Sequence, residues 1–182
     1  MTMLVQREPT TENKPYVLAD VKAHARVTHS HEDGLFDTMA AQSAFEIEQF
    51  AQIALLFQTI SVTLIDPQGE RGLFLPIGPV IGDTKPTVTI DGVAFEAFEF
   101  VSGVRPYIRW TQSMAWGAIG RINVEYQAGF GATADAVPAD LAQAISDQAV
   151  LLYDARGQIN ARSLTSSPHL ARVGARYRGV RL

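Results

Sequence analysis

The sequence predicts an α+β fold that is mainly helical, and three observations carry this prediction. Apolar residues recur every three to four positions over residues 18–28, 32–57 and 138–155, which is typical of helices that bury one face. Between the second and third segments the period changes to two, which indicates strands. The last 27 residues carry six arginines and no acid. We therefore expect a helical core of a short helix, a long helix and a C-terminal helix, with a small antiparallel β unit inserted at about 59–128 and an extended basic C-terminal tail.

The ends of the expected helices carry signals of their own. Residues 1–15 are polar, so they are expected to form a loose arm before the first helix. Ser30 is suited to cap the second helix, and the acids Glu32 and Asp33 in its first turn favour the positive end of the helix dipole. Pro138 suits the first turn of the third helix, where its missing N–H has no partner in any case.

Short runs between these helices predict five or six strands. Residues 59–65 alternate polar and apolar side chains and are rich in β-branched residues. Asp91-Gly92 is a typical hairpin turn, and we expect it to join a strand at 87–93 to a partner at 95–101. Further strands are expected at 73–75, 105–110 and 121–126.

The composition describes an acidic chain without cysteine and with unevenly distributed charge. Its 182 residues, 47% of them hydrophobic, can bury one sizeable core, so a single domain over 1–156 with an arm over 157–182 is expected. The net charge is −4, but all 19 acids lie at or before Asp154, so the body carries −10 and the tail +6. Without cysteine, no disulfide or thiolate metal site forms. No apolar run approaches the roughly 20 residues of a membrane helix, and a signal peptide is not evident, so a soluble cytoplasmic protein is expected.

No group of residues has the spacing that a catalytic or metal site requires. The spacing from His24 to His29 does not place both on one helix face, so a solvated helix end is the favoured interpretation. Residues 129–131, Gly-Phe-Gly, lack the further glycine of a dinucleotide fingerprint and the Gly-Lys-Ser/Thr of a P-loop, and they are interpreted as a turn. We therefore expect no enzyme, no metal and no cofactor. The titratable residues considered are His24, His29, His31, His169, Glu46, Glu48, Glu96 and Glu99.

The arginine-rich tail carries the clearest functional implication. A solvated, disordered end is the simplest interpretation of a charged terminus. However, arginine forks suit carboxylate or phosphate groups, and the interleaved apolar and aromatic residues suit docking into a groove. Six charges on a short arm would bind DNA only weakly and with strong salt dependence, so a protein partner is favoured over DNA. The residues expected to bind it are Arg156, Arg162, Arg172, Arg176, Tyr177, Arg178, Arg181 and Leu182.

Several sequence blocks resemble those of the phage head–tail connector (adaptor) family, which occurs in long-tailed phages, prophages and gene transfer agents. The resemblance spans roughly residues 16–156. It departs from the family pattern at residues 54–58, where a Thr-Gly turn is frequent, and at Phe130, where tyrosine is frequent. The blocks, in the usual order of the family, are LADVKAHARV at 18–27, LFLP at 73–76, VEYQAGFG at 124–131 and VPADL at 137–141.

This resemblance implies a structural virion protein that forms a ring, usually a dodecamer, in the neck of a phage or phage-like particle. The ring would join the portal protein to the stopper or tail-terminator protein, and double-stranded DNA would pass through its channel without sequence-specific binding. The tail would then dock on the portal or on a neighbouring subunit. An acidic body suits such a channel, because a wall that repels phosphate lets DNA slide.

The β insertion, with its exposed loop at 76–86 and the stretch from Trp110 to Trp116, is expected to contact neighbouring subunits or the next ring, because aromatic residues on loops often anchor interfaces. Burial of both tryptophans in the core is an equal alternative. For the whole chain, the alternatives that stay open are a DNA-binding packaging or regulatory factor that uses the basic tail, and a small hydrolase with a β insertion.

Overall fold

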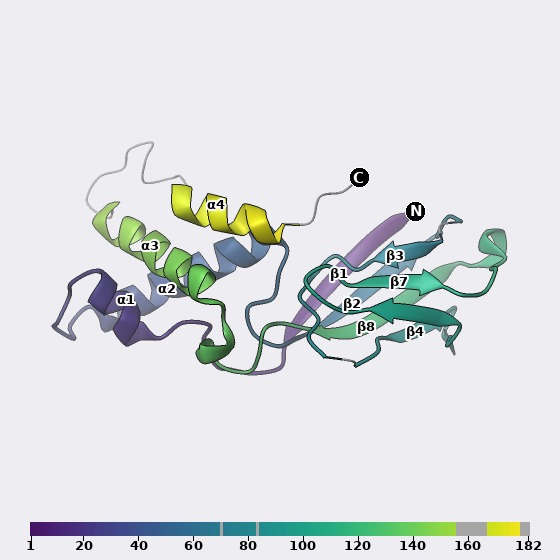
Figure 1. Cartoon of the computed structure of the whole chain (residues 1–182), viewed down its shortest axis with the longest axis horizontal. Coiled ribbons are helices and arrows are strands. Elements are labelled where there is room, and N and C mark those ends of the chain that lie inside the picture. Colours follow the sequence, from purple (N-terminus) through teal and green to yellow (C-terminus); the bar gives the residue numbers. More distant parts are fainter. Residues whose placement is uncertain (70, 83, 156–166, 179–182) are drawn as a thin grey trace. The chain divides into compact units, whose positions relative to one another are not determined.

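The chain, seen in a computed structural model, divides into two compact units (Figure 1). The structure describes residues 1–69, 71–82, 84–155 and 167–178. A β unit comprises Met1–Glu12 and Phe57–Phe130, and a helical unit comprises Asn13–Leu56 and Gly131–Leu182.

The β unit contains two antiparallel sheets. One has five strands in the order β1-β2-β8-β4-β5, and the other has three in the order β3-β7-β6. A short 3₁₀ turn, Trp116–Ala118, precedes the last strand. The strands are β1 Thr2–Pro9, β2 Gln58–Ile65, β3 Gly72–Phe74, β4 Thr87–Ile90, β5 Val93–Ala94, β6 Phe98–Val101, β7 Tyr107–Trp110 and β8 Arg121–Ala128.

Alternation along β2 and β8 builds the core of this unit. The buried residues of β2 lie opposite the buried residues of β8, for example Ile60 opposite Tyr126 and Val62 opposite Val124. The residues between them are polar and face the other side of the sheet. The buried Tyr126 hydroxyl donates to the Ile77 carbonyl oxygen at 3.0 Å and accepts from its N–H at 3.2 Å, so the polar group that burial encloses is satisfied.

Four helices form the described part of the helical unit. Phe36 and Ile47 of the long helix and Leu141 and Ile145 of the third helix are fully buried, which gives this unit a core of its own. A 3₁₀ turn at Ala134–Ala136 precedes the third helix. The helices are α1 Leu18–His24, α2 Asp33–Ala51, α3 Ala139–Ala155 and α4 Pro168–Tyr177.

Helix α2 ends at Ala51, before the apolar pattern of the sequence ends. Gln52 adopts a left-handed conformation, with φ of 55°, and its N–H bonds the Glu48 carbonyl oxygen. The Glu48 side chain then accepts the Leu55 N–H at 2.7 Å. Residues 53–56 remain buried after the helix has ended, which is why their apolar character resembles a continuation of it.

The expectation of a mainly helical fold is wrong. Among the described residues 36% are helical and 27% lie in strands. One source of the error is residues 1–15, expected as a loose arm: β1 pairs with β2 along its whole length, from Thr2 opposite Ile65 to Pro9 opposite Gln58. An edge strand can be polar on both faces because the backbone ladder holds it, so its side chains carry no strong signal.

Two further expectations are corrected. The basic tail is not extended over residues 168–177, which form α4. The Asp91-Gly92 turn is confirmed, with φ of 49° and 85°, but its partner strand is β5, while β6 belongs to the other sheet. Strands β2, β3, β7 and β8 lie where the sequence predicts them.

Candidate partner-binding site

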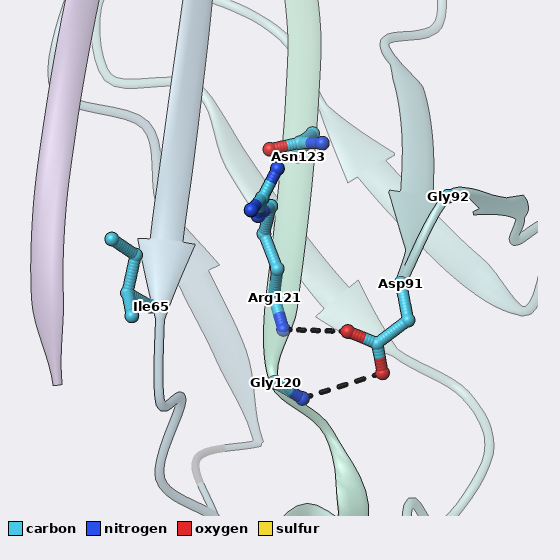
Figure 2. A pocket seen from close by; sticks show the side chains of 6 residues that line it. All are labelled: Ile65, Asp91, Gly92, Gly120, Arg121 and Asn123. Carbon is cyan, nitrogen blue, oxygen red and sulfur yellow. Dashed lines mark hydrogen bonds between the residues drawn. The ribbon is translucent and has the colours of Figure 1, made fainter.

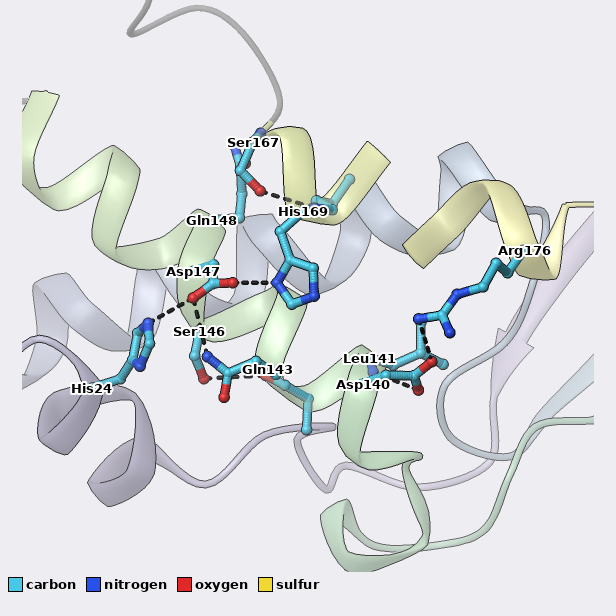
Figure 3. A network of polar contacts seen from close by, with 12 residues as sticks. His24, Asp140, Leu141, Gln143, Ser146, Asp147, Gln148, Ser167, His169 and Arg176 are labelled. Atoms are coloured by element: carbon cyan, nitrogen blue, oxygen red, sulfur yellow. Dashed lines mark hydrogen bonds and ion pairs between the residues drawn. The ribbon is translucent and has the colours of Figure 1, made fainter. Parts of the chain in front are cut away.

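Helix α4 starts at a well-formed N-cap. The Ser167 hydroxyl oxygen accepts the Leu170 N–H at 3.0 Å, and Pro168 occupies the first turn. The Ser167 N–H in turn donates to Oε1 of Gln148, a residue of α3 that is 2% exposed, at 2.6 Å. A buried amide on α3 thus fixes where α4 begins (Figure 3).

One side of α4 is part of the core of the helical unit. Leu170 and Val173 are fully buried. Gly174 allows a close approach to α2, because a Cβ at this position would lie 2.6 Å from Cδ1 of Phe50. Residues 168–177 of the basic tail are therefore anchored by apolar packing, although their composition suggests a solvated segment.

Asp147 of α3 joins α4 to α1. One carboxylate oxygen contacts Nδ1 of His169 on α4, and the other lies 2.6 Å from Nε2 of His24 on α1 and accepts from the Gln143 amide at 3.1 Å (Figure 3). Burial alone would raise the pKa of Asp147, but the hydrogen bonds from His169, Gln143 and His24 outweigh it, so the pKa lies below its ordinary value.

The sequence does not predict this cluster, because the pattern places His24 at a solvated helix end and His169 alone in the tail. His169 follows Asp147 by 22 residues, a separation that no local spacing rule covers. Within the described ranges, no group of three His, Cys, Asp or Glu residues has the arrangement of a metal site. The contacts of the cluster link α1, α3 and α4.

Asp140 at the start of α3 holds the other end of α4. It pairs with the Arg176 guanidinium at 3.0 Å and accepts the Tyr177 hydroxyl at 3.0 Å. Partial burial and the bond to Asp140 raise the pKa of Tyr177. The Arg176 side chain is 60% exposed, so it remains accessible while it is paired with Asp140.

The predicted partner-binding residues divide into two groups. Arg172 and Arg176 lie one turn apart on α4, and both are exposed. Arg178 is exposed as well and lies over the Phe50 ring at 5.6 Å from its centroid, while Tyr177 is half-buried. The others lie outside the described residues: Arg156, Arg162, Arg181 and Leu182.

Trp110 and Trp116 lie in the β unit and contact each other edge to face, with ring centroids 6.5 Å apart. Phe95 packs on Trp110 in the same manner at 5.9 Å. Both tryptophans are half-buried, so each keeps part of its ring accessible, and their role as contacts to other subunits remains a prediction.

A shallow pocket of about 500 Å³ opens at the end of the five-stranded sheet (Figure 2). The Asp91 carboxylate, its acidic group, accepts the Arg121 N–H at 2.8 Å and the Gly120 N–H at 3.3 Å. These two hydrogen bonds satisfy the carboxylate and join the β4–β5 hairpin to the start of β8. Among the described lining residues there is no catalytic arrangement. The pocket is lined by Ile65, Asp91, Gly92, Gly120, Arg121 and Asn123.

Comparisons with known proteins show which solved structures have a similar fold. No protein-family model matches the chain, and no curated protein matches it. A chain from the virion of a native gene transfer agent particle is 24% identical, with a TM-score of 0.75. A chain from the neck of an empty gene transfer agent particle, computed with C6 symmetry, is 25% identical, with a TM-score of 0.74. A chain from the neck of the native particle, computed with C12 symmetry, is 23% identical, with a TM-score of 0.72. Each match covers 98% of this chain and 97% of the other.

These matches define the class of the protein by its fold, which is that of chains in the neck of a gene transfer agent particle. The resemblance to head–tail connector proteins that the sequence blocks indicated is thereby confirmed. In the part of the chain that is described, no helix is long and apolar enough to cross a membrane.

Proposed function

We propose that this chain is a structural subunit of the neck of a phage or phage-like particle, in which copies form a ring between the portal and the stopper or tail proteins. The observation that carries the proposal is the shared fold over 98% of the chain, at 25% identity, with a neck chain. The C6 and C12 symmetries of the neck structures support a ring of copies, and twelve is the copy number we propose. The role is structural and not enzymatic.

Within this ring, the C-terminal segment would dock on the portal or on a neighbouring subunit through the exposed side of α4, whose other side packs in the core of the helical unit. The exposed guanidinium groups of Arg172 and Arg176 on α4 support this assignment, because forked donors one helical turn apart suit acidic groups of a protein partner. The remaining acidic surface would let DNA pass through the channel without binding to it.

Deleting the tail is a poor test of this arm, because Leu170 and Val173 belong to the core of the helical unit. A sharper test reverses the charge of the exposed arginines in the double variant Arg172→Glu/Arg176→Glu. The matched controls are Arg71→Glu, at an exposed arginine of the β unit, and Asp140→Asn, which removes the ion pair that Arg176 makes with α3 and keeps both arginines. Binding to purified portal protein and incorporation into particles are measured for each variant.

We expect the double variant to lose at least tenfold in portal binding and both controls to bind as the wild type does. Normal portal binding by the double variant would contradict the docking role. Retention of duplex DNA at physiological salt, lost in the double variant, would instead favour the alternative, a DNA-binding packaging or regulatory factor. Absence of the wild-type chain from purified particles would contradict the structural role altogether.

A further inference from the structure

The outer face of the three-stranded sheet carries an exposed apolar row. Phe74 of β3 and Val101 of β6 both lie opposite Tyr107 of β7, so the three side chains stand side by side on one face. Phe74 is 71% exposed and Val101 is 56% exposed. The rings of Phe74 and Tyr107 are in contact, with centroids 4.6 Å apart. We call Phe74, Tyr107 and Val101 the apolar row.

The surroundings of the row resemble an interface rather than a solvated sheet. Next to it, Glu99 and Arg109 face the same side and form an ion pair at 2.6 Å, so a polar edge borders the apolar centre. The central strand β2 of the five-stranded sheet differs, because its outward positions Thr59, Ser61 and Thr63 are polar. A row of exposed apolar and aromatic side chains across adjacent strands marks a site of protein contact.

The helical unit carries a second surface without charge. At about 100° per residue, the exposed positions of α2 fall within an arc of about 120°. None of them is charged, and Phe45, near the middle of the arc, is 61% exposed. We call this surface the uncharged face of α2; it consists of Gly34, Leu35, Thr38, Ala41, Gln42, Phe45 and Gln49.

The acids of α2 lie at half-buried positions and bond within the chain. Asp33 contacts Lys22, and Asp37 pairs with Lys14 at 2.6 Å. The other two also have partners: Glu46 accepts from Gln42 at 3.1 Å and Glu48 accepts from the Leu55 N–H at 2.7 Å. A solvated helix ordinarily presents its charges to water, so their retraction from one long face indicates that another protein surface covers it.

We propose that the apolar row of one copy packs on the uncharged face of α2 in the next copy around the ring. The proposal rests on the proposed function, because a ring places every copy between two others. A closed ring needs two different, complementary patches on each chain, and these two surfaces supply one in each unit. Both lack charge at their centres, which suits a permanent contact between copies and does not suit DNA.

Dimensions agree with this pairing. Three strands span about 10 Å across the sheet at roughly 4.8 Å between neighbours. The 19 residues of α2 span about 28 Å at 1.5 Å per residue. One helix can therefore cover the full row, and two turns of its uncharged face suffice to do so.

The first experiment places one charge in each surface and follows incorporation of the chain into particles. Phe74→Lys and Phe45→Lys are the test variants. Val93→Lys, at a 70% exposed position of β5, and Val17→Lys, at a 42% exposed position before α1, are the matched controls. Because all four side chains are exposed, each variant is expected to melt within a few degrees of the wild type. We expect both test variants to fall at least tenfold in particles and both controls to remain near the wild-type level.

The second experiment uses the absence of cysteine from the chain. Phe74→Cys and Phe45→Cys are introduced singly and together, and purified particles are treated with a short bismaleimide linker. The double variant should give a ladder of multiples of the chain mass, because each copy is joined to the next. Each single variant should stay monomeric.

The outcomes separate the two proposals. If the wild-type chain is present in particles, two results would overturn this inference and leave the proposed function in place. One is normal incorporation of Phe74→Lys, and the other is the formation of linked dimers by Phe74→Cys alone. Linkage of Phe74→Cys to a different particle protein would overturn it equally. Absence of the wild-type chain from particles would overturn both.

Discussion

The two ends of the chain look alike in sequence and are held in place by different forces. Residues 1–15 and the basic tail are both polar, yet β1 pairs with β2 over Thr2–Pro9 while α4 packs into the helical unit over Pro168–Tyr177. Strand β1 depends on backbone hydrogen bonds, since Leu4 and Val5 remain 51% and 39% exposed. Helix α4 depends on fully buried side chains. The polar composition of a terminal segment therefore does not predict whether the segment is ordered or which interactions stabilise it.

The largest test of this difference is loss of an apolar side chain at each end. Leu170→Ala removes a fully buried side chain of α4 and should lower the free energy of unfolding by about 2–5 kcal/mol. Leu4→Ala, at a half-exposed position of β1, should change it by about 0.5 kcal/mol or less. Urea unfolding followed by circular dichroism measures both. Similar losses for the two variants would show that side chains hold both ends.

The reverse test breaks one backbone bond at a time in β1. The Thr10 N–H donates to the Phe57 carbonyl oxygen, and hydrogen-bonded residue pairs alternate with non-bonded pairs along an antiparallel ladder. Gln6 and its partner Ser61 therefore form a hydrogen-bonded pair, whereas Val5 and its partner Val62 do not. Gln6→Pro should therefore cost about 1–3 kcal/mol through the acceptor that it leaves unpaired.

Val5→Pro is the matched control, because the N–H that it removes points away from β2. We expect hydrogen exchange in β2 to accelerate strongly in Gln6→Pro and little in Val5→Pro. Equal acceleration in both variants would contradict the assignment of β1 as a strand held by its ladder.

A third test concerns the cap of α4. Ser167→Ala removes the oxygen that accepts the Leu170 N–H and should lower the free energy of unfolding by about 1 kcal/mol. Ser167→Asp keeps an acceptor at this position and should restore most of the loss. If Ser167→Ala and Ser167→Asp unfold alike, the cap does not contribute to the docking of α4.

The sequence predicts the elements whose pattern is local. The alternation over residues 59–65 and the spacing after Pro138 identify β2 and α3, because both lie half in a core and half outside it. The tail arginines could be selected as partner-binding candidates by composition alone, and Arg172, Arg176 and Arg178 do lie at exposed positions.

The elements that were missed depend on distant partners. Strand β1 forms because β2, about 50 residues later in the chain, offers an edge with which its backbone can pair. Helix α4 is held in place because the buried Gln148 side chain accepts the Ser167 N–H and because Phe50 packs against Gly174. The Asp147 cluster joins three helices that are separated in sequence. Strand β1 and the Asp147 cluster leave no periodic signal in their own segments. Helix α4 does carry one, because Leu170, Val173 and Tyr177 recur at spacings of three and four, but the arginines around them favour the interpretation as a solvated end.

The smallest expected effect is a dependence of α4 docking on pH. The pKa of Asp147 is lowered in the folded chain, so its contribution to stability is present above the ordinary carboxyl pKa and is lost as pH falls through the lowered value. Its neighbours are His169 of α4, His24 of α1 and Gln143 of its own helix. In the wild type, the free energy of unfolding should therefore fall between pH 7 and acidic pH, and this fall should be smaller in Asp147→Asn. The control is Asp20→Asn, at an exposed acid of α1, for which the fall should equal that of the wild type. Because β1 has no contact to Asp147, the rate of hydrogen exchange in β2 should not change in Asp147→Asn. Equal changes in the exchange rates of β2 and α4 would contradict the separate anchoring of the two chain ends.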